Sequence, residues 1–150
     1  GIDKKTVDKY LDLLEQTFVL FSLNGFSRNS RKEVTKSSRY YFYDVGVRNT
    51  LINNFNGLNL RTDFGDIWEN YLIMERIKKQ KYTEIWSNNY FWRTYDQQEI
   101  DWIEEHDGKI FAYEFKFGQK SVKAPKAWSE MYPESEFKPI NRENYIDFIA

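Results

Sequence analysis

The N-terminal third of the chain changes from a helical to a strand-like hydrophobic pattern. Between Lys4 and Glu15, apolar side chains recur at steps of three and four residues, namely Val7, Tyr10, Leu11 and Leu14. This spacing predicts a helix with one buried face. Two strand-like segments follow, at residues 18–23 and 40–45, with a turn signal at Asn24-Gly25. We therefore expect a helix followed by a two-stranded ribbon.

The remainder of the chain predicts a helix, three strands, a helix and a strand. Asp63 or Asp66 can cap a helix that runs to about residue 80, and apolar positions nearly all round it indicate that it is mostly buried. Strand-like runs follow at 83–95, 99–105 and 109–117, then a helix at 123–132, a strand at 136–140 and a helical end at 141–149. This order predicts an α/β (α+β) fold, with a domain boundary that divides the chain into residues 1–61 and 62–150.

Composition restricts the chemistry that the chain can perform. A chain of 150 residues with 41% apolar and 19% aromatic side chains has enough material for a single well-packed core. The longest apolar runs, at residues 18–21 and 71–74, are far too short to span a membrane. The chain has no cysteine and one histidine, which excludes disulfides, thiol nucleophiles and zinc sites built on sulfur. Any metal ion must therefore be held mainly by oxygen atoms.

Charge is distributed unevenly although the net charge is only −1. Residues 1–48 carry nine basic and six acidic side chains, whereas residues 49–150 carry thirteen and seventeen. The basic side chains concentrate in the loop between the first two strands, at Arg28, Arg31, Lys32, Lys36 and Arg39. A helix and ribbon with a basic tip resemble part of a winged helix, so this loop is a candidate for contact with nucleic-acid phosphates. A solvated hairpin loop is the alternative interpretation.

The start of the chain bears on its cellular setting. It begins at Gly1, in mid-pattern, without an initiator Met or the hydrophobic segment of a signal peptide. We therefore expect a fragment of a longer cytoplasmic protein.

The strongest local signal for a site is a hairpin. Asp107-Gly108 between two strand-like runs favours a two-residue type I′ turn. If His106 and Lys109 close this turn, Asp101 lies opposite Glu114, and Lys116 lies on the same face. Two opposed carboxylates repel, and a divalent cation such as Mg²⁺ or Mn²⁺, held by both, would relieve that repulsion. A water molecule acidified by the ion and oriented by Lys116 could then attack a phosphodiester.

A structural role explains the same residues without catalysis. Glu-x-Lys is a common pattern on solvated strands, and Glu99 opposite Lys116 can form a cross-strand ion pair. Glu69 lies on the predicted helix at 63–80 with no basic neighbour one turn away, and it is either a site residue or a partly solvated carboxylate.

The motif of Asp101 followed by Glu114-Phe115-Lys116 resembles the PD-(D/E)XK nuclease superfamily. The predicted order of elements over residues 66–140 is similar to the restriction-endonuclease-like αβββαβ core of that superfamily. The resemblance implies that Asp101 and Glu114 bind Mg²⁺, that Lys116 assists the attacking water, and that an acid on the first helix, here Glu69, supports the site. No proline precedes Asp101, which departs from the motif.

A second resemblance covers most of the chain. It rests on the blocks Thr6–Glu15, Phe26–Asn29, Tyr41–Asn49, Trp68–Asn70, Phe91–Asp101 and Tyr113–Lys116. These blocks resemble the C-terminal region of a family of prokaryotic AAA+ ATPases, in which an ATPase module precedes a winged helix and a nuclease-like domain of uncharacterised function. The chain has no Gly-x-x-x-x-Gly-Lys-Ser/Thr phosphate loop, so we expect it not to bind ATP through that motif.

Two functional hypotheses follow from the sequence. The first is a nuclease-like domain of an AAA+ ATPase that hydrolyses phosphodiesters of DNA, with a divalent cation held by Asp101 and Glu114 and with Lys116 as the activating group. The second is a non-catalytic module with the same fold, in which the basic ribbon tethers the ATPase module of the same polypeptide to nucleic acid or to a partner protein.

Overall fold

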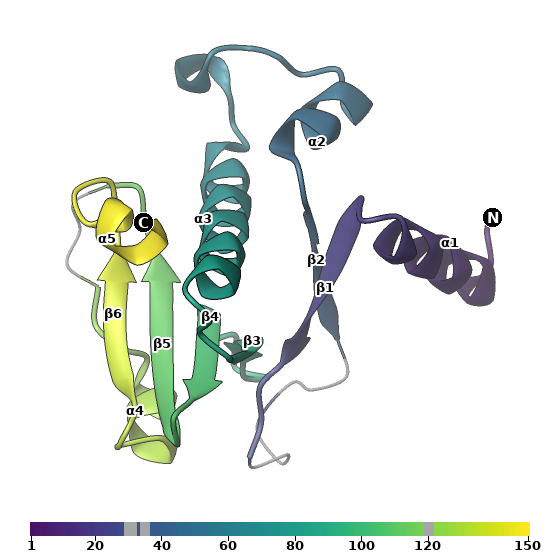
Figure 1. Ribbon diagram of the computed structural model, residues 1–150. Coiled ribbons are helices and arrows are strands. Elements are labelled where there is room, and N and C mark those ends of the chain that lie inside the picture. Colours follow the sequence, from purple (N-terminus) through teal and green to yellow (C-terminus); the bar gives the residue numbers. More distant parts are fainter. Residues whose placement is uncertain (29–32, 34–36, 119–121) are drawn as a thin grey trace.

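The fold is built around one mixed β-sheet. The computed structural model describes residues 1–28, 33, 37–118 and 122–150. Within these residues, six strands pair in the order β2-β1-β3-β4-β5-β6 (Figure 1). Their bounds are β1 Leu20–Gly25, β2 Ser38–Phe42, β3 Asn88–Arg93, β4 Glu99–His106, β5 Lys109–Phe115 and β6 Glu136–Ile140. The predicted α/β class is confirmed.

Helices cover both faces of the sheet. They are α1 Lys4–Gln16, α2 Val45–Leu51, α3 Phe64–Tyr82, α4 Lys126–Met131 and α5 Tyr145–Ile149, with a 3₁₀ turn at Leu58–Leu60. Side chains of α3 and α5 pack with Phe91, Trp102 and Phe115 in one cluster. Trp128 of α4 packs with Ile100 and Ile103 in a second cluster. The sheet therefore has an apolar core on each face. The helix α3, predicted to be mostly buried, buries seven of its 19 residues.

The N-terminal ribbon is continuous with the main sheet. β1 and β2 are antiparallel, and β1 then pairs in parallel with β3, with Asn24 opposite Tyr90 and Gly25 opposite Phe91. β3, β4 and β5 are antiparallel to one another, and β6 runs parallel to β5. Both predicted segments thus contribute strands to one sheet, while the boundary between 61 and 62 stays a prediction.

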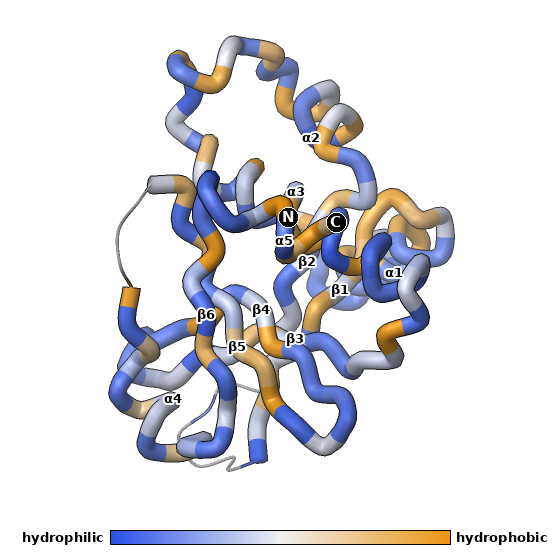
Figure 2. Tube along the Cα trace, turned by 60° about the vertical axis from the view of Figure 1, so that its left-hand side comes forward, coloured by the Kyte–Doolittle hydropathy of each residue, from blue (hydrophilic) through white to orange (hydrophobic). Residues whose placement is uncertain are grey.

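The predicted burial of the first helix is wrong. α1 forms with Asp3 as its N-cap, whose side chain accepts a hydrogen bond from the backbone N–H of Thr6. None of the described residues of α1 is buried, and Val7, Tyr10 and Leu14 are exposed. In Figure 1 the helix projects away from the layers formed by the sheet and α3, and Figure 2 shows apolar and polar segments alternating along it. The periodicity identified an apolar face correctly, but a periodic pattern does not supply a surface for that face to cover.

Among the residues that the structure describes, no helix combines the length and the apolar character that a membrane crossing requires. This agrees with the short apolar runs of the sequence.

Candidate functional site

The β4–β5 hairpin has the predicted turn and register. Asp107 and Gly108 have φ values of 53° and 72°, the positive φ that a type I′ turn requires at both central positions. His106 pairs with Lys109, and the same register continues to Trp102 opposite Tyr113. The next pair along this register is Asp101 and Glu114, so the hairpin brings the two predicted acids onto neighbouring strands.

A β-bulge at Asp101 changes the faces that the sequence predicted. Between β3 and β4 the register shifts, because Tyr90 pairs with Ile103 whereas Trp92 pairs with Ile100. β4 therefore has one extra residue at Asp101-Trp102, and simple alternation fails there. Trp102 packs in one core cluster, whereas Ile100 and Ile103 pack in the other, on the opposite face of the sheet. Nothing in the local sequence marks this bulge.

The Asp101 carboxylate contacts the backbone of β5 and the side chain of Arg39. One carboxylate oxygen accepts a hydrogen bond from the backbone N–H of Phe115, at 2.9 Å. The other lies 3.6 Å from a guanidinium nitrogen of Arg39 on β2. Asp101 is only 6% exposed. The carboxylate is therefore held in place by the backbone on one side and faces a cation on the other.

Glu114 and Lys116 form an ion pair at the end of β5. The Lys116 Nζ lies 2.8 Å from Glu114 Oε1. The second carboxylate oxygen, Oε2, is buried and has no hydrogen-bond partner among the described residues. Glu114 is 8% exposed, whereas the side chain of Lys116 is half-exposed. The ammonium can thus reach solvent, and the carboxylate retains one oxygen free to bind a further ligand.

Glu69 approaches the same region from α3. Its Oε1 accepts a hydrogen bond from the Tyr41 hydroxyl at 2.5 Å and lies 3.5 Å from Arg39 Nη1. The neighbouring Asn70 exchanges two hydrogen bonds with the backbone of Phe42, at 2.9 and 2.8 Å, which fixes β2 against α3. Glu69 therefore lies beside Arg39 in the acid cluster, while its side chain is 25% exposed, as a partly solvated carboxylate is. Its role in a site stays a prediction.

Arg39 is the cation of this cluster, which the sequence did not predict. Its guanidinium contacts Glu69 and Asp101 and donates a hydrogen bond at 2.7 Å to Glu99. It also lies over the Phe91 ring, 4.7 Å from the centroid. Arg39 is separated from Glu69 by 30 residues and from Glu99 by 60, so no local spacing could reveal these contacts.

The remaining basic residues of the predicted nucleic-acid surface are only partly described. Arg28 is exposed and forms an ion pair with Glu105, while its backbone N–H donates a hydrogen bond to the Tyr132 hydroxyl. Arg31, Lys32 and Lys36 lie outside the described residues. The nucleic-acid interface at this loop stays a prediction.

The surroundings make ionisation of the acids costly. Burial raises the pKa of Glu69 to about 7, and the Asp101 carboxylate adds to the rise while Tyr41 and Arg39 oppose it. Burial also raises the pKa of Asp101, against the opposing effect of the Phe115 N–H. The pKa of Glu114 is raised by burial and by the nearby Asp101. The raised pKa values show that nearby cations and hydrogen-bond donors do not fully offset the cost of burying these negative charges.

For Lys116, nearby charges outweigh the effect of burial on the pKa. Burial alone would lower the pKa of its ammonium, but the hydrogen bond and charge of Glu114 raise it overall, with contributions from Asp101 and Glu99. Lys116 is therefore a stable cation at neutral pH and a donor of hydrogen bonds.

The buried acid pair fits a hard divalent cation. Asp101 and Glu114 offer oxygen ligands only, and the unpaired Oε2 of Glu114 is a buried acceptor that a cation would satisfy. In the described part of the chain, no group of three or more His, Cys, Asp or Glu side chains is placed to hold a metal ion. The ion would depend on two carboxylates and on water for its other ligands, as is common for Mg²⁺.

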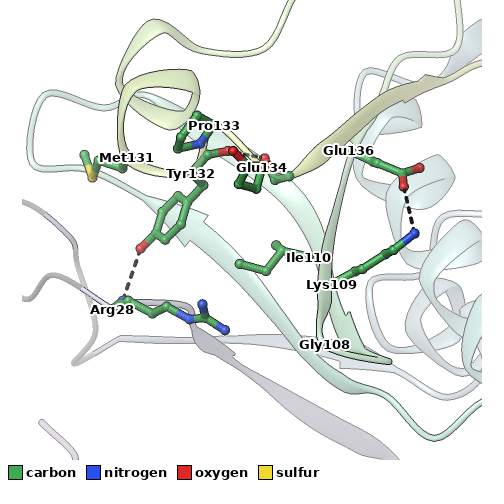
Figure 3. Close-up of a pocket in the computed structure, with 10 residues that line it drawn as sticks. Arg28, Gly108, Lys109, Ile110, Met131, Tyr132, Pro133, Glu134 and Glu136 are labelled. Carbon is green, nitrogen blue, oxygen red and sulfur yellow. Dashed lines mark hydrogen bonds and ion pairs between the residues drawn. The ribbon is translucent and has the colours of Figure 1, made fainter.

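Two cavities lie at opposite ends of the β4–β5 hairpin. One of about 370 Å³ borders the acid cluster and is lined by residues of β2, α2, α3 and β4, including Arg39, Tyr41, Arg48, Glu69 and Glu99. A larger one of about 530 Å³ lies at the turn, between Gly108-Lys109 and the segment after α4 (Figure 3). In it Tyr132 points toward Arg28, and Lys109 faces Glu136 at 3.9 Å. The smaller cavity is lined by Glu69 and Glu99 but not by Asp101, Glu114 or Lys116, so it borders one side of the acid cluster.

The fold and the acid cluster can now be set against known proteins. No solved structure matches the chain. Two relatives, "Uncharacterized protein Rv2008c" of Mycobacterium tuberculosis and "Uncharacterized protein Mb2031c" of Mycobacterium bovis, are each 25% identical over 117 residues, or 77% of this chain. The chain spans only 26% of the length of these relatives.

Two family descriptions match the sequence in adjacent segments. One, "Domain of unknown function (DUF8612)", matches residues 1–58. The other matches residues 64–145, more than half of the chain, and includes Glu69, Asp101, Glu114 and Lys116. On this match, the chain belongs to the family described as "Domain of unknown function (DUF4143)".

Proposed function

We propose that this chain carries a nuclease-like site that hydrolyses phosphodiesters of nucleic acid with Mg²⁺ or Mn²⁺. One observation supports this above others. The buried carboxylates of Asp101 and Glu114 lie on neighbouring strands, one oxygen of Glu114 is unpaired, and the Lys116 ammonium stands beside it. This set of groups matches the chemistry that a metal-assisted displacement at phosphorus requires.

Each residue has a distinct part in the proposed reaction. A bound cation would supply positive charge at the phosphoryl oxygens and acidify a water ligand. Asp101 and Glu114 would hold it, and the Phe115 N–H keeps Asp101 in orientation. The half-exposed Lys116 would orient the attacking water and donate to a phosphoryl oxygen as charge develops there. As the water oxygen bonds to phosphorus, the ester bond to the leaving oxygen breaks, and that oxygen takes up a proton.

We also propose that the chain acts within an AAA+ ATPase polypeptide. The sequence blocks that resemble the C-terminal region of such ATPases support this, and so does the greater length of the relatives. In this proposal the ribbon formed by β1 and β2, similar to part of a winged helix, presents its basic loop to nucleic acid.

The test is cleavage by the 150-residue chain. Linear, single-stranded and branched DNA and RNA are incubated with Mg²⁺ or Mn²⁺, with EDTA as the metal-free reference. We expect Asp101→Asn and Lys116→Met each to reduce cleavage about 100-fold or more. Lys126→Met, which removes an exposed lysine paired only loosely with Glu130, is the matched control and should cleave as the wild type does. Activity that survives both site substitutions would refute the assignment.

The second candidate is the non-catalytic module. It is favoured by the fact that Arg39 and Lys116 already neutralise much of the acid cluster, as in a structural ion network. Under this alternative the chain binds nucleic acid or a partner through the basic ribbon without cleavage. Absence of both cleavage and any metal-dependent rise in melting temperature would favour it.

A further inference from the structure

The position of Arg39 has a consequence for metal binding. Its side chain comes from β2, the edge strand of the sheet, and extends to carboxylates on α3 and β4. The Arg39 guanidinium lies beside Glu69 and Asp101. A metal ion held by Asp101 would therefore lie close to it. Two cations cannot both stay there without strong repulsion, because Coulomb energies at separations of a few ångströms are large in a partly buried site.

The contacts of Arg39 with Glu69 and Asp101 are loose. Arg39 lies 3.5 Å from Glu69 and 3.6 Å from Asp101, which are ion-pair separations at or beyond the limit of a good hydrogen bond. Its close contact, at 2.7 Å, is with Glu99, whose side chain is nearly half-exposed. Arg39 can therefore leave Asp101 while it keeps Glu99 and its position over Phe91.

The cavity beside the cluster gives the side chain room to move. Arg39 and Glu99 both line the space of about 370 Å³ next to β2 and α3. A long arginine side chain can change rotamer into this space without displacement of the backbone.

We propose that Arg39 is an exchangeable internal cation that occupies the acid cluster when no metal is bound and that competes with Mg²⁺ for it. This inference rests on the proposed metal site at Asp101 and Glu114. Arg39 is then a positioning residue that sets the metal affinity of the cluster.

The main test measures metal affinity in matched variants. Mn²⁺ and Mg²⁺ are titrated into the wild-type chain, Arg39→Gln, Arg39→Lys and Arg142→Gln by calorimetry. Arg142→Gln is the matched control, because Arg142 is an exposed arginine outside the acid cluster. We expect Arg39→Gln to bind Mn²⁺ about tenfold or more tightly than the wild type, and the other two variants to stay within about twofold of it. Loss of a merely structural contact would not raise metal affinity.

A measurement on the wild-type chain covers the case in which Arg39→Gln does not fold. The side-chain Nε–H signal of Arg39, assigned by its loss in Arg39→Lys, should shift on addition of Mg²⁺, and the signal of Arg142 should not. An unshifted Arg39 signal in metal-bound protein would overturn the exchange.

The outcomes separate this inference from the proposed function. If the wild-type chain and Arg39→Gln bind metal with equal affinity, or if Arg39→Gln binds it more weakly, the competition is overturned and the metal site is retained. Binding by Arg39→Gln alone supports the competition. Binding by neither protein, or binding that Asp101→Asn does not weaken, refutes the metal site and the competition with it.

Discussion

Stability should depend strongly on one buried ion pair that joins α3 to β4. Arg76 donates to both carboxylate oxygens of Glu104, at 2.6 and 2.7 Å, and to the carbonyl of Phe148 at 2.9 Å. Glu104 is fully buried and also accepts a hydrogen bond from the Trp102 indole N–H at 2.7 Å. The pair fixes the helix that carries Glu69 to the strand that carries Asp101.

Glu104→Gln is the informative perturbation, because it keeps the volume, removes the negative charge and replaces one of the two acceptor oxygens with an amide NH₂ group. Arg76 is then left as an uncompensated buried cation, which costs roughly 3–5 kcal/mol. A domain of this size has a total stability of about 5–15 kcal/mol. At about 2–4 °C per kcal/mol, the melting temperature should fall by roughly 6–20 °C.

The assays are thermal unfolding, which gives the melting temperature, and urea unfolding, which gives the free energy of unfolding, each followed by tryptophan fluorescence and circular dichroism. Lys78→Met, on the same helix, breaks an exposed pair with Glu75 at 2.6 Å and should cost less than about 1 kcal/mol. The double variant Arg76→Met/Glu104→Met leaves no unpaired charge. Its loss of unfolding free energy should therefore be smaller than the sum of the losses in the single variants Arg76→Met and Glu104→Met. A loss below about 1 kcal/mol for Glu104→Gln, or strict additivity in the double variant, would refute the reasoning.

Three further predictions concern the elements around the site. Because the pKa of Glu69 is raised to about 7 in the folded chain, its contribution to stability is complete below the unfolded value near 4.5 and is lost as pH rises through 7. The free energy of unfolding, measured with urea in EDTA at a series of pH values, should decline in this way for the wild type and should depend less on pH for Glu69→Gln. Gly108→Ala, at φ 72°, should cost about 1 kcal/mol in the same assay. Asn70→Ala removes both hydrogen bonds to Phe42 and should cost about 1–3 kcal/mol, with faster amide exchange at Phe42 than at β4 residues.

The sequence predicted the parts of the fold that local physics determines. The positive-φ turn at Asp107-Gly108 set the register of β4 and β5, and hydrophobic periodicity located the order of helices and strands from α3 to β6. Turn chemistry and periodicity act over a few residues, so a single sequence is enough to read them.

The parts that failed depend on tertiary contacts. The bulge at Asp101-Trp102 arises from pairing with β3, which lies outside the hairpin whose register the turn set. Arg39 entered the prediction as a surface residue because its neighbours in sequence are basic, whereas its neighbours in space are acids from α3 and β4. The apolar face of α1 was identified, but its exposure was not, since burial depends on which other elements lie nearby.

Charge balance links the acid cluster, its cations and the proposed metal. The described ion pairs bring four carboxylates to three cations, namely Glu69, Glu99, Asp101 and Glu114 with Arg39, Arg93 and Lys116. Fully ionised, this group carries one net negative charge, and one proton on Glu69, whose pKa is near 7, neutralises it. If Mg²⁺ replaces Arg39, one positive charge leaves and two arrive, so the group becomes neutral with Glu69 ionised. The arrangement therefore has two neutral states, one with a proton and Arg39 in place and one with a divalent cation, which is the condition for exchange between them at neutral pH.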